Sequence, residues 1–192
     1  MFETRLLTSL DGLPRASWDA LFGDTLEGYD YLRAIETAGL EGFAWRYVLV
    51  QRDGHLVAAA PAFITDYRLE TTFDGGGRKI AEQVRRIAPG VMTPRLGCLG
   101  SPCTETARVS FAADLSERDR PTVLKALIDA FERDAMRAGC SLMGVKDADA
   151  AQSVLWSGAM GAAGYSAVPG QAIADLVIDF SDLETYLARL SS

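Results

Sequence analysis

The sequence predicts a mixed α/β fold with an early antiparallel hairpin and a later crossover helix. Two observations predict it: an apolar hairpin pattern in the first third of the chain, and a long amphipathic helix pattern between two strand-like segments further on. The chain has 192 residues, 48% of them hydrophobic, which suits one compact core. We therefore expect a single domain over residues 1–180, with an insertion at 74–93.

Two short helices are expected near the N-terminus. In "ASWDALFGD", Ser17 is the expected N-cap, because a serine hydroxyl can accept a hydrogen bond from the first helical turn. Apolar residues at helical spacing predict the second helix, from Leu26 to Leu40. Gly39 stands near its end, where a left-handed C-cap is usual.

A β-hairpin is the clearest local prediction. The two apolar segments of "FAWRYVLVQRDGHLVAAAPAFI" are joined by Asp53-Gly54, a pair that tolerates the positive φ angles of a tight turn. The next segment, "FDGGGRKIAEQVRRIAPG", breaks the alternation with three glycines and then becomes basic. It is therefore expected to be the insertion between two strands.

The second half of the chain alternates strands and helices. "RLGCLG" is strand-like, "CSLMGVKDAD" is typical of a short buried strand, "AQSVLWSGAMGAAG" of a helix, and "QAIADLVIDF" of a final strand. Between the first two, Pro121 suits the first turn of a long helix that runs to Gly139. Its expected buried stripe comprises Leu124, Leu127, Ile128, Phe131 and Ala135.

Composition excludes several classes of partner. The formal net charge of -7 argues against nucleic-acid binding, which needs clustered Lys and Arg. The longest apolar run, "LVAAAPAFI", is far shorter than a membrane span needs. Three cysteines without framework spacing are expected of reduced thiols in a cytoplasm. The single histidine, His55, completes no zinc set, so no metal is expected.

The segment "RLGCLGSPCTETARVSF", residues 95–111, bends sharply between two strand-like stretches. It is not a hydrolase nucleophile elbow, because Pro102 and Cys103 follow Ser101 where that turn needs Gly-x-Ser-x-Gly. Nor does it make a zinc loop, because Cys98 and Cys103 are only two of the four ligands required. The remaining interpretation is a corner where the sheet opens.

The order of elements resembles the GNAT acyltransferase fold. More narrowly, "WDALFGDTLEGYDYLRAIETAG", "RDGHLVAAAPAFI", "LGSPCTE" and "DFSDLETYLARLS" resemble, in order, the N-terminal half of FemAB-like proteins. The resemblance implies two GNAT-like halves in tandem and transfer of an acyl or aminoacyl group to an amine. The best-known members act in peptidoglycan cross-bridge synthesis.

On this resemblance, "RLGCLG" is the central strand that splays from its neighbour and exposes backbone groups to a cleft. An exposed N–H there can bind the thioester oxygen as it gains charge, while a carboxylate accepts the amine proton. Glu105 is the candidate catalytic base. The candidate substrate-binding residues are Ser101 and Thr104 at the cleft mouth, Lys146 after the next strand, and Asp74 before three glycines.

The donor site departs from the GNAT pattern. Members that bind acyl-CoA usually cradle its pyrophosphate with a Gln/Arg-x-x-Gly-x-Gly/Ala loop that opens the long helix. Here "DLSERDR" stands before Pro121, with carboxylates in place of glycines. We therefore expect acyl-CoA, if it is the co-substrate, not to be bound by this half in the usual manner, and aminoacyl-tRNA is the other candidate donor. The alternative function is a non-catalytic module that binds substrate or a companion half.

The end of the chain predicts a helix start. Ser181 and Glu184 have the spacing of a capping box, and Leu183, Leu187 and Leu190 form an apolar stripe. On the FemAB resemblance, residues 181–192 lead into a second GNAT-like half that this chain lacks. The stripe should then be partly exposed, or covered by another copy of the chain.

Overall fold

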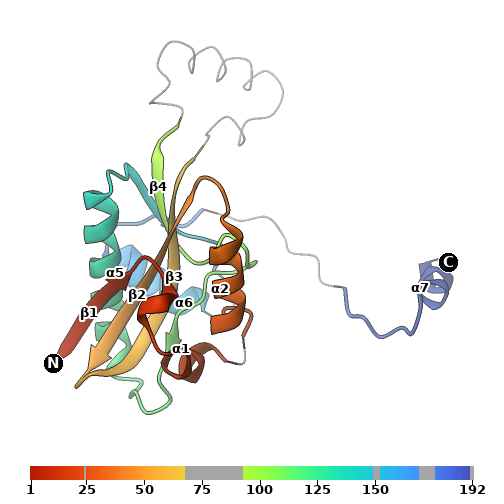
Figure 1. Cartoon of the computed structure of the whole chain (residues 1–192), viewed down its shortest axis with the longest axis horizontal. Helices are drawn as coiled ribbons and strands as arrows, with labels where there is room; N and C mark the ends of the chain where they lie inside the picture. Colours follow the sequence, from red (N-terminus) through yellow and green to blue (C-terminus); the bar gives the residue numbers. More distant parts are fainter. Residues whose placement is uncertain (24, 68–92, 149–151, 169–175, 191–192) are drawn as a thin grey trace, which may run out of the picture.

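The structure is a computed structural model in which one mixed sheet organises the chain (Figure 1). It describes residues 1–23, 25–67, 93–148, 152–168 and 176–190. The predicted insertion at 74–93 lies outside these residues apart from position 93.

The sheet has six strands in the order β1-β2-β3-β4-β6, and β5 pairs with β3 beside this path. Neighbours run antiparallel except for β4 and β6, which are parallel. The mixed α/β class, with its early hairpin and later crossover, is therefore confirmed. The strands are β1 (Phe2–Leu7), β2 (Phe43–Arg52), β3 (His55–Asp66), β4 (Arg95–Leu99), β5 (Ser110–Phe111) and β6 (Leu142–Val145).

The predicted hairpin is present as β2 and β3. Asp53 and Gly54 join the strands with φ angles of 53° and 78°, so both residues of the turn are left-handed, as a tight hairpin requires. The strands pair from Phe43 opposite Thr65 to Arg52 opposite His55. This long pair forms the centre of the sheet.

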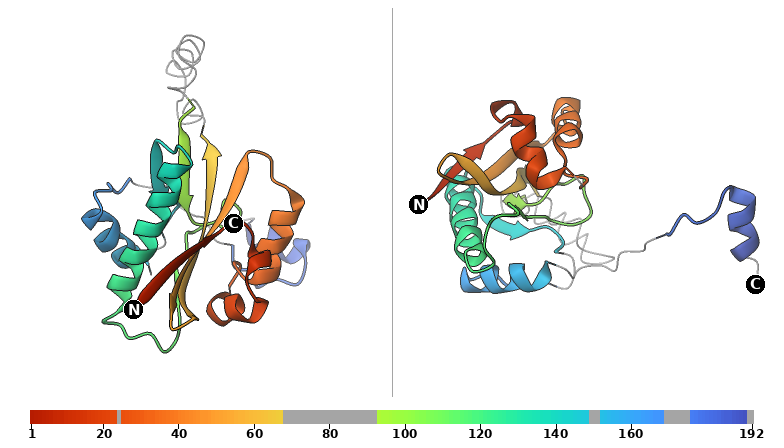
Figure 2. Two further views of the ribbon diagram at one scale, coloured as in Figure 1. Left: turned by 60° about the vertical axis from the view of Figure 1, so that its left-hand side comes forward. Right: turned by 90° about the horizontal axis from the view of Figure 1, so that it is seen from below.

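The crossover helix α5 (Arg120–Arg137) packs on one face of the sheet, and α6 (Ser153–Ala162) packs beside it (Figure 2). The helix lies close to β4 because Gly97 has no side chain. A Cβ at that position would lie 3.0 Å from the Cβ of Ala135. All five residues of the predicted stripe are buried: Leu124, Leu127, Ile128, Phe131 and Ala135.

The opposite face is covered by a short 3-10 helix η1 (Leu10–Gly12), by α1 (Arg15–Phe22) and by α2 (Tyr29–Ala38) (Figure 2). Both predicted helices are confirmed, and Gly39 ends α2 with the expected left-handed φ of 67°. The predicted cap at Ser17 is wrong. Helix α1 begins three residues earlier than predicted, after its N-cap Pro14, so Ser17 lies within its first turn.

The sequence analysis missed β1, which pairs along its whole length with β2 at the edge of the sheet. Glu3 and Arg5 are exposed on it, and their charges hide its strand character. The prediction of a buried strand at 140–149 is only half right. Strand β6 forms there, but Leu142 is exposed, because β6 lies at the other end of the sheet.

The predicted last strand is not formed over 176–180, and residues 171–175 lie outside the described part of the chain. Helix α7 (Leu183–Leu190) follows it, with none of its residues buried. Its cap is Asp182, whose carboxylate accepts the N–H of Thr185 at 2.8 Å, rather than the predicted box of Ser181 and Glu184. That hydrogen bond is the main reason why the pKa of Asp182 lies below its ordinary value.

Candidate functional site

The strand opposite β3 is interrupted by a loop. Strand β4 pairs with β3 as far as Leu99 opposite Ala62, and β5 resumes with Ser110 opposite Ala59. Between these two pairs β3 advances by three residues, whereas the segment that leads from β4 to β5 advances by eleven. Residues 100–109, the 100–109 loop, therefore leave the sheet at the corner that the sequence predicted.

Gly100 makes the exit turn of this loop. Its N–H donates to the carbonyl of Pro61 at 2.8 Å, which keeps it attached to β3, and its φ of 111° lies where side-chain-bearing residues are strained. A Cβ there would lie 3.0 Å from the Cβ of Ala107. Only glycine suits both the backbone angle and the close approach.

The loop is held together by its own polar groups. The hydroxyl of Ser101 accepts the N–H of Cys103 at 3.2 Å, and the hydroxyl of Thr104 lies 3.4 Å from the carbonyl of Ser101 and 3.3 Å from that of Thr106. Ser101 is 1% exposed and Thr104 is 8% exposed. These two predicted substrate-binding residues thus lie in the loop as expected, with hydroxyls that already have partners.

Lys146 ties the loop to the end of β6. Its Nζ donates to the carbonyl oxygens of Thr104 and, at 3.0 Å, Glu105, and it lies 3.6 Å from the carboxylate of Asp147. In return, the N–H of Ala107 donates to the carbonyl of Lys146 at 3.0 Å. The loop therefore bridges the carboxyl ends of the parallel strands β4 and β6.

Helix α2 and the residue Glu27 before it contact the loop from the other side. The hydroxyl of Tyr31 donates to the carbonyl of Cys103 at 2.9 Å, and Arg108 Nε lies 3.8 Å from the carboxylate of Glu27. The Glu27 side chain is only 4% exposed. Its carbonyl accepts the indole N–H of Trp18 at 2.7 Å. The sequence analysis missed Tyr31, Glu27 and Arg108, because nothing in the sequence links them to the loop.

Glu105, the candidate base, is exposed at the surface of the loop. Its backbone carbonyl is held by Lys146, whereas its carboxylate makes no ion pair within the described part of the chain. Asp74 lies outside the described residues. The structure thus brings together four of the five predicted site residues, Ser101, Thr104, Glu105 and Lys146, in or against the loop.

One thiol beside the loop is buried within the sheet. Cys98 is buried on β4, and its burial raises the pKa of the thiol to about 12, so it is not a thiolate at neutral pH. Among the residues that the structure describes, no group of three His, Cys, Asp or Glu side chains could hold a metal ion. The same residues contain no helix both long and apolar enough to span a bilayer.

The start of α5 is an acidic turn. The carboxylate of Asp119 accepts the hydroxyl of Ser116 at 2.8 Å, and the backbone N–H of Asp119 donates back to that hydroxyl at 3.2 Å. The N–H of Arg120 donates to the carbonyl of Ser116, and Pro121 has none. An anion at this helix start would meet the carboxylate of Asp119 and the backbone N–H groups of Asp119 and Arg120, which are already bonded.

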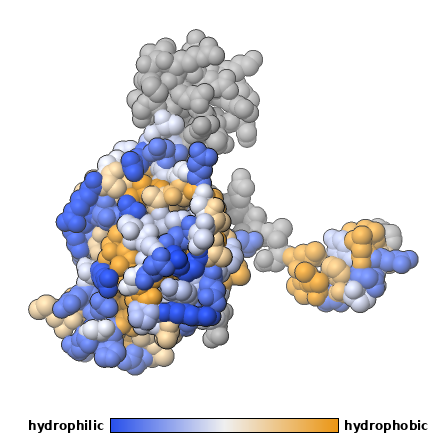
Figure 3. Space-filling view, in the orientation of Figure 1, coloured by the Kyte–Doolittle hydropathy of each residue, from blue (hydrophilic) through white to orange (hydrophobic). Residues whose placement is uncertain are grey.

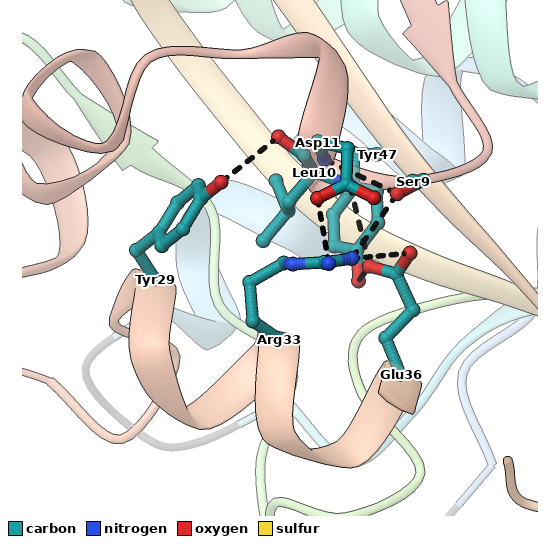
Figure 4. Close-up of polar contacts among 7 residues, drawn as sticks. All are labelled: Ser9, Leu10, Asp11, Tyr29, Arg33, Glu36 and Tyr47. Atoms are coloured by element: carbon teal, nitrogen blue, oxygen red, sulfur yellow. Dashed lines mark hydrogen bonds and ion pairs between the residues drawn. The ribbon is translucent and has the colours of Figure 1, made fainter. Parts of the chain in front are cut away.

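A polar network fixes α2 to the sheet (Figure 4). The guanidinium of Arg33 lies 2.6 Å from the carboxylate of Asp11 and 2.9 Å from that of Glu36. The other oxygen of Glu36 accepts the N–H of Leu10 at 3.2 Å and the hydroxyl of Tyr47 at 3.1 Å. Burial, and then the nearby Glu36 carboxylate, raise the pKa of Tyr47 above its ordinary value. This network positions the helix that carries Tyr31.

Comparisons with known proteins identify the fold. No protein-family model and no curated protein sequence matches the chain. A solved GNAT family acetyltransferase from Staphylococcus aureus superposes with a TM-score of 0.51 at 9% identity, over 91% of this chain and 98% of that one. The chain has a GNAT-like fold.

Two further structural neighbours have different named functions, one an acetyltransferase and the other a transcriptional regulator. Aminoglycoside N-acetyltransferase AAC(6')-Iy, solved in complex with CoA, gives a TM-score of 0.56 at 15% identity over 92% of this chain and 95% of that one. A transcriptional regulator from Bacillus halodurans gives 0.53 at 10% identity over 91% and 100%. At such identities the likeness confirms the predicted fold and leaves the activity open.

Proposed function

We propose that this chain is a FemAB-like N-acyltransferase unit that transfers an acyl or aminoacyl group from a thioester or aminoacyl donor to an amine. The observation that carries the proposal is the 100–109 loop, which interrupts the strand opposite β3 at the carboxyl ends of the parallel strands β4 and β6. Ligands of open α/β sheets gather at such ends. An aminoglycoside N-acetyltransferase among the structural neighbours supports the same reaction class.

The reaction assigns a role to each loop residue. The amine nitrogen attacks the donor carbonyl carbon, the bond to the thiolate or the nucleotide hydroxyl breaks, and Glu105 takes the proton that the amine must lose. Ser101 and Thr104 fix the conformation of the loop, which is proposed to line the mouth of the substrate cleft. Lys146 carries the positive charge that would pair with an anionic substrate group. Asp74 is proposed to contact the same substrate.

The donor is proposed to bind away from the start of α5. The carboxylates of Glu117 and Asp119 would repel a pyrophosphate there, and the backbone N–H groups of Asp119 and Arg120 are already bonded. An aminoacyl-tRNA, or CoA held by other groups, fits this arrangement. A cytoplasmic location, which the three cysteines without framework spacing favour, is part of the proposal. A peptidoglycan-related role and a second GNAT-like unit as partner complete it, and both rest on the FemAB resemblance.

A second candidate function is a non-catalytic module that binds substrate or a companion domain. The favouring observation is that the hydroxyls of Ser101 and Thr104 and the amine of Lys146 already have partners inside the loop. One structural neighbour is named a transcriptional regulator rather than an acetyltransferase, which supports considering a function other than acyl transfer. The loop would then be a recognition surface.

Thermal unfolding with ligands separates the two functions. The melting temperature of the chain is measured by scanning fluorimetry with acyl-CoAs, with amino sugars and with nucleotide-linked sugars, since binding to the native state raises it. A shift with an acyl-CoA supports the acyltransferase. A shift with acceptor-type sugars only supports the binding module and contradicts transfer from CoA.

A further inference from the structure

Helix α7 and the 100–109 loop each expose side chains that the proposed function leaves unused. On α7 these are Leu183, Leu187 and Leu190, which colour its surface as hydrophobic in Figure 3, but no observation indicates what would cover them. On the loop the side chain is Arg108, and its surroundings do indicate a ligand.

Arg108 is a cation with unused hydrogen-bond donors. A guanidinium group carries five N–H donors in a planar fork. Within the described part of the chain, the side chain of Arg108 makes one polar contact, the ion pair of its Nε with the Glu27 carboxylate. That distance is 3.8 Å, which is too long for a hydrogen bond, and the side chain is 38% exposed. The guanidinium can therefore donate to a ligand without giving up a hydrogen bond to these residues.

Glu27 holds Arg108 from the interior of the domain. Its side chain is 4% exposed, and its carboxylate accepts no hydrogen bond from the described residues. Its backbone is fixed, because its carbonyl accepts the indole N–H of the fully buried Trp18 at 2.7 Å. A nearly buried carboxylate is costly unless a positive charge lies beside it, and Arg108 supplies that charge. Arg108 is thus held at the loop by a fixed negative charge, while more than a third of its side chain stays exposed.

Lys146, the other cation that contacts the loop, is already engaged. Its Nζ donates to the carbonyl oxygens of Thr104 and Glu105 and lies 3.6 Å from the carboxylate of Asp147. Lys146 can therefore add positive charge to the site, whereas Arg108 adds charge together with free N–H donors. The planar fork of an arginine matches the two oxygens of a carboxylate or a phosphate, which a lysine meets only as a point charge.

We propose that Arg108 binds an anionic group, a carboxylate or a phosphate, on the amine that the chain acylates. This inference rests on the proposed function and names the class of its acceptor, an amine that also carries an anionic group. Arg108 follows Glu105 by three residues, so their Cα atoms are at most about 11 Å apart. A ligand of the size of an amino sugar phosphate can then meet both side chains. Glu27 is the positioning residue for Arg108.

Calorimetric titration with two pairs of ligands tests the proposal. Glucosamine 6-phosphate and glucosamine differ in a phosphate, and L-alanine and L-alaninamide differ in a carboxylate. The parent should bind the anionic member of one pair about tenfold more tightly than the neutral member, and that pair identifies the anion. Arg108→Met should reduce this preference to less than about twofold. Arg52→Met is the matched control and should keep the preference, because Arg52 is 34% exposed and pairs with Asp114 at 3.5 Å outside the loop.

Two further variants separate ligand binding from folding. Arg108→Lys keeps a positive charge beside Glu27 but lacks the fork, so its melting temperature should match that of the parent while its preference falls. The double variant Glu27→Gln with Arg108→Met removes both charges together, so no nearly buried carboxylate is left without a partner. It should fold and bind both members of each pair equally.

The proposal is overturned if the parent binds neither anionic ligand, or binds both members of each pair equally. It is also overturned if Arg108→Met, or the folded double variant, keeps the preference of the parent. Failure of the proposed function gives a different result. A preference for the anionic ligand that depends on Arg108, without acyl transfer to that ligand, would contradict the acyltransferase and leave the anion site in place.

Discussion

The two faces of the sheet are held in different ways. On one face, α5 contributes apolar side chains that are almost fully buried, such as Leu124, Leu127 and Phe131. On the other face, α2 is attached through hydrogen bonds and ion pairs of Arg33, Glu36 and Tyr47, and it reaches the 100–109 loop through Tyr31. Apolar burial scales with area and gives stability, whereas hydrogen bonds add less net energy but fix geometry. Both faces therefore stabilise the domain through burial, since Trp18, Phe22 and Leu32 are buried on the α2 face, and the polar network of the α2 face also positions the candidate site.

The largest effect is expected on the α5 face. Phe131→Ala removes a fully buried aromatic ring, which should lower the free energy of unfolding by about 3 to 5 kcal/mol. Denaturant unfolding measures it, and Met136→Ala on the same helix is the control because Met136 is exposed. A loss below about 1 kcal/mol for Phe131→Ala would contradict tight packing of α5 against the sheet.

A smaller effect is expected in the polar network of the α2 face. Glu36→Ala removes the acceptor of the Leu10 N–H and the Tyr47 hydroxyl, so two partly or fully buried donors lose their partner, at a cost of about 3 kcal/mol. The exposed Glu41→Ala is the control. If Glu36→Ala unfolds at the same denaturant concentration as the parent, the network does not hold α2 in place.

The loop exit should be sensitive to a single methyl group. Gly100→Ala forces a side chain onto a φ of 111° and against Ala107, which should cost about 2 kcal/mol. Gly144→Ala is the control, since a Cβ there meets no atom within 4 Å. Equal stabilities of the two variants would show that the loop adapts freely and is not a rigid part of the α2 face.

The sequence predicted best what short-range patterns determine. The turn at Asp53-Gly54 and the stripe of α5 follow from neighbouring residues, and both were confirmed. Strand β1 was missed because the exposed charges Glu3 and Arg5 interrupt its apolar residues, while its pairing partner lies some forty residues away along the chain. Local spacing carries no information about such a partner.

The sequence predicted only the part of the candidate site that lies within one segment, because local spacing does not reveal contacts between distant residues. Ser101, Thr104 and Glu105 are neighbours in the sequence, and their corner was predicted correctly as the end of a strand. Tyr31 contacts Cys103 across 72 positions of sequence, so only the folded chain reveals it. The predicted last strand does not form over 176–180, because a strand-forming sequence pattern does not tell whether a neighbouring strand is available for pairing.

The most direct test of the account is acyl transfer by Glu105→Gln. Glu105 is exposed, so its stability should change by less than about 0.5 kcal/mol, the smallest structural effect considered. The measurement is kcat/KM for thiol release from acetyl-CoA in the presence of an amino sugar or nucleotide-linked sugar that raises the melting temperature, with Glu41→Gln as control. The account predicts a loss of roughly 100-fold for Glu105→Gln and none for the control. Equal kcat/KM in Glu105→Gln and the parent would contradict it.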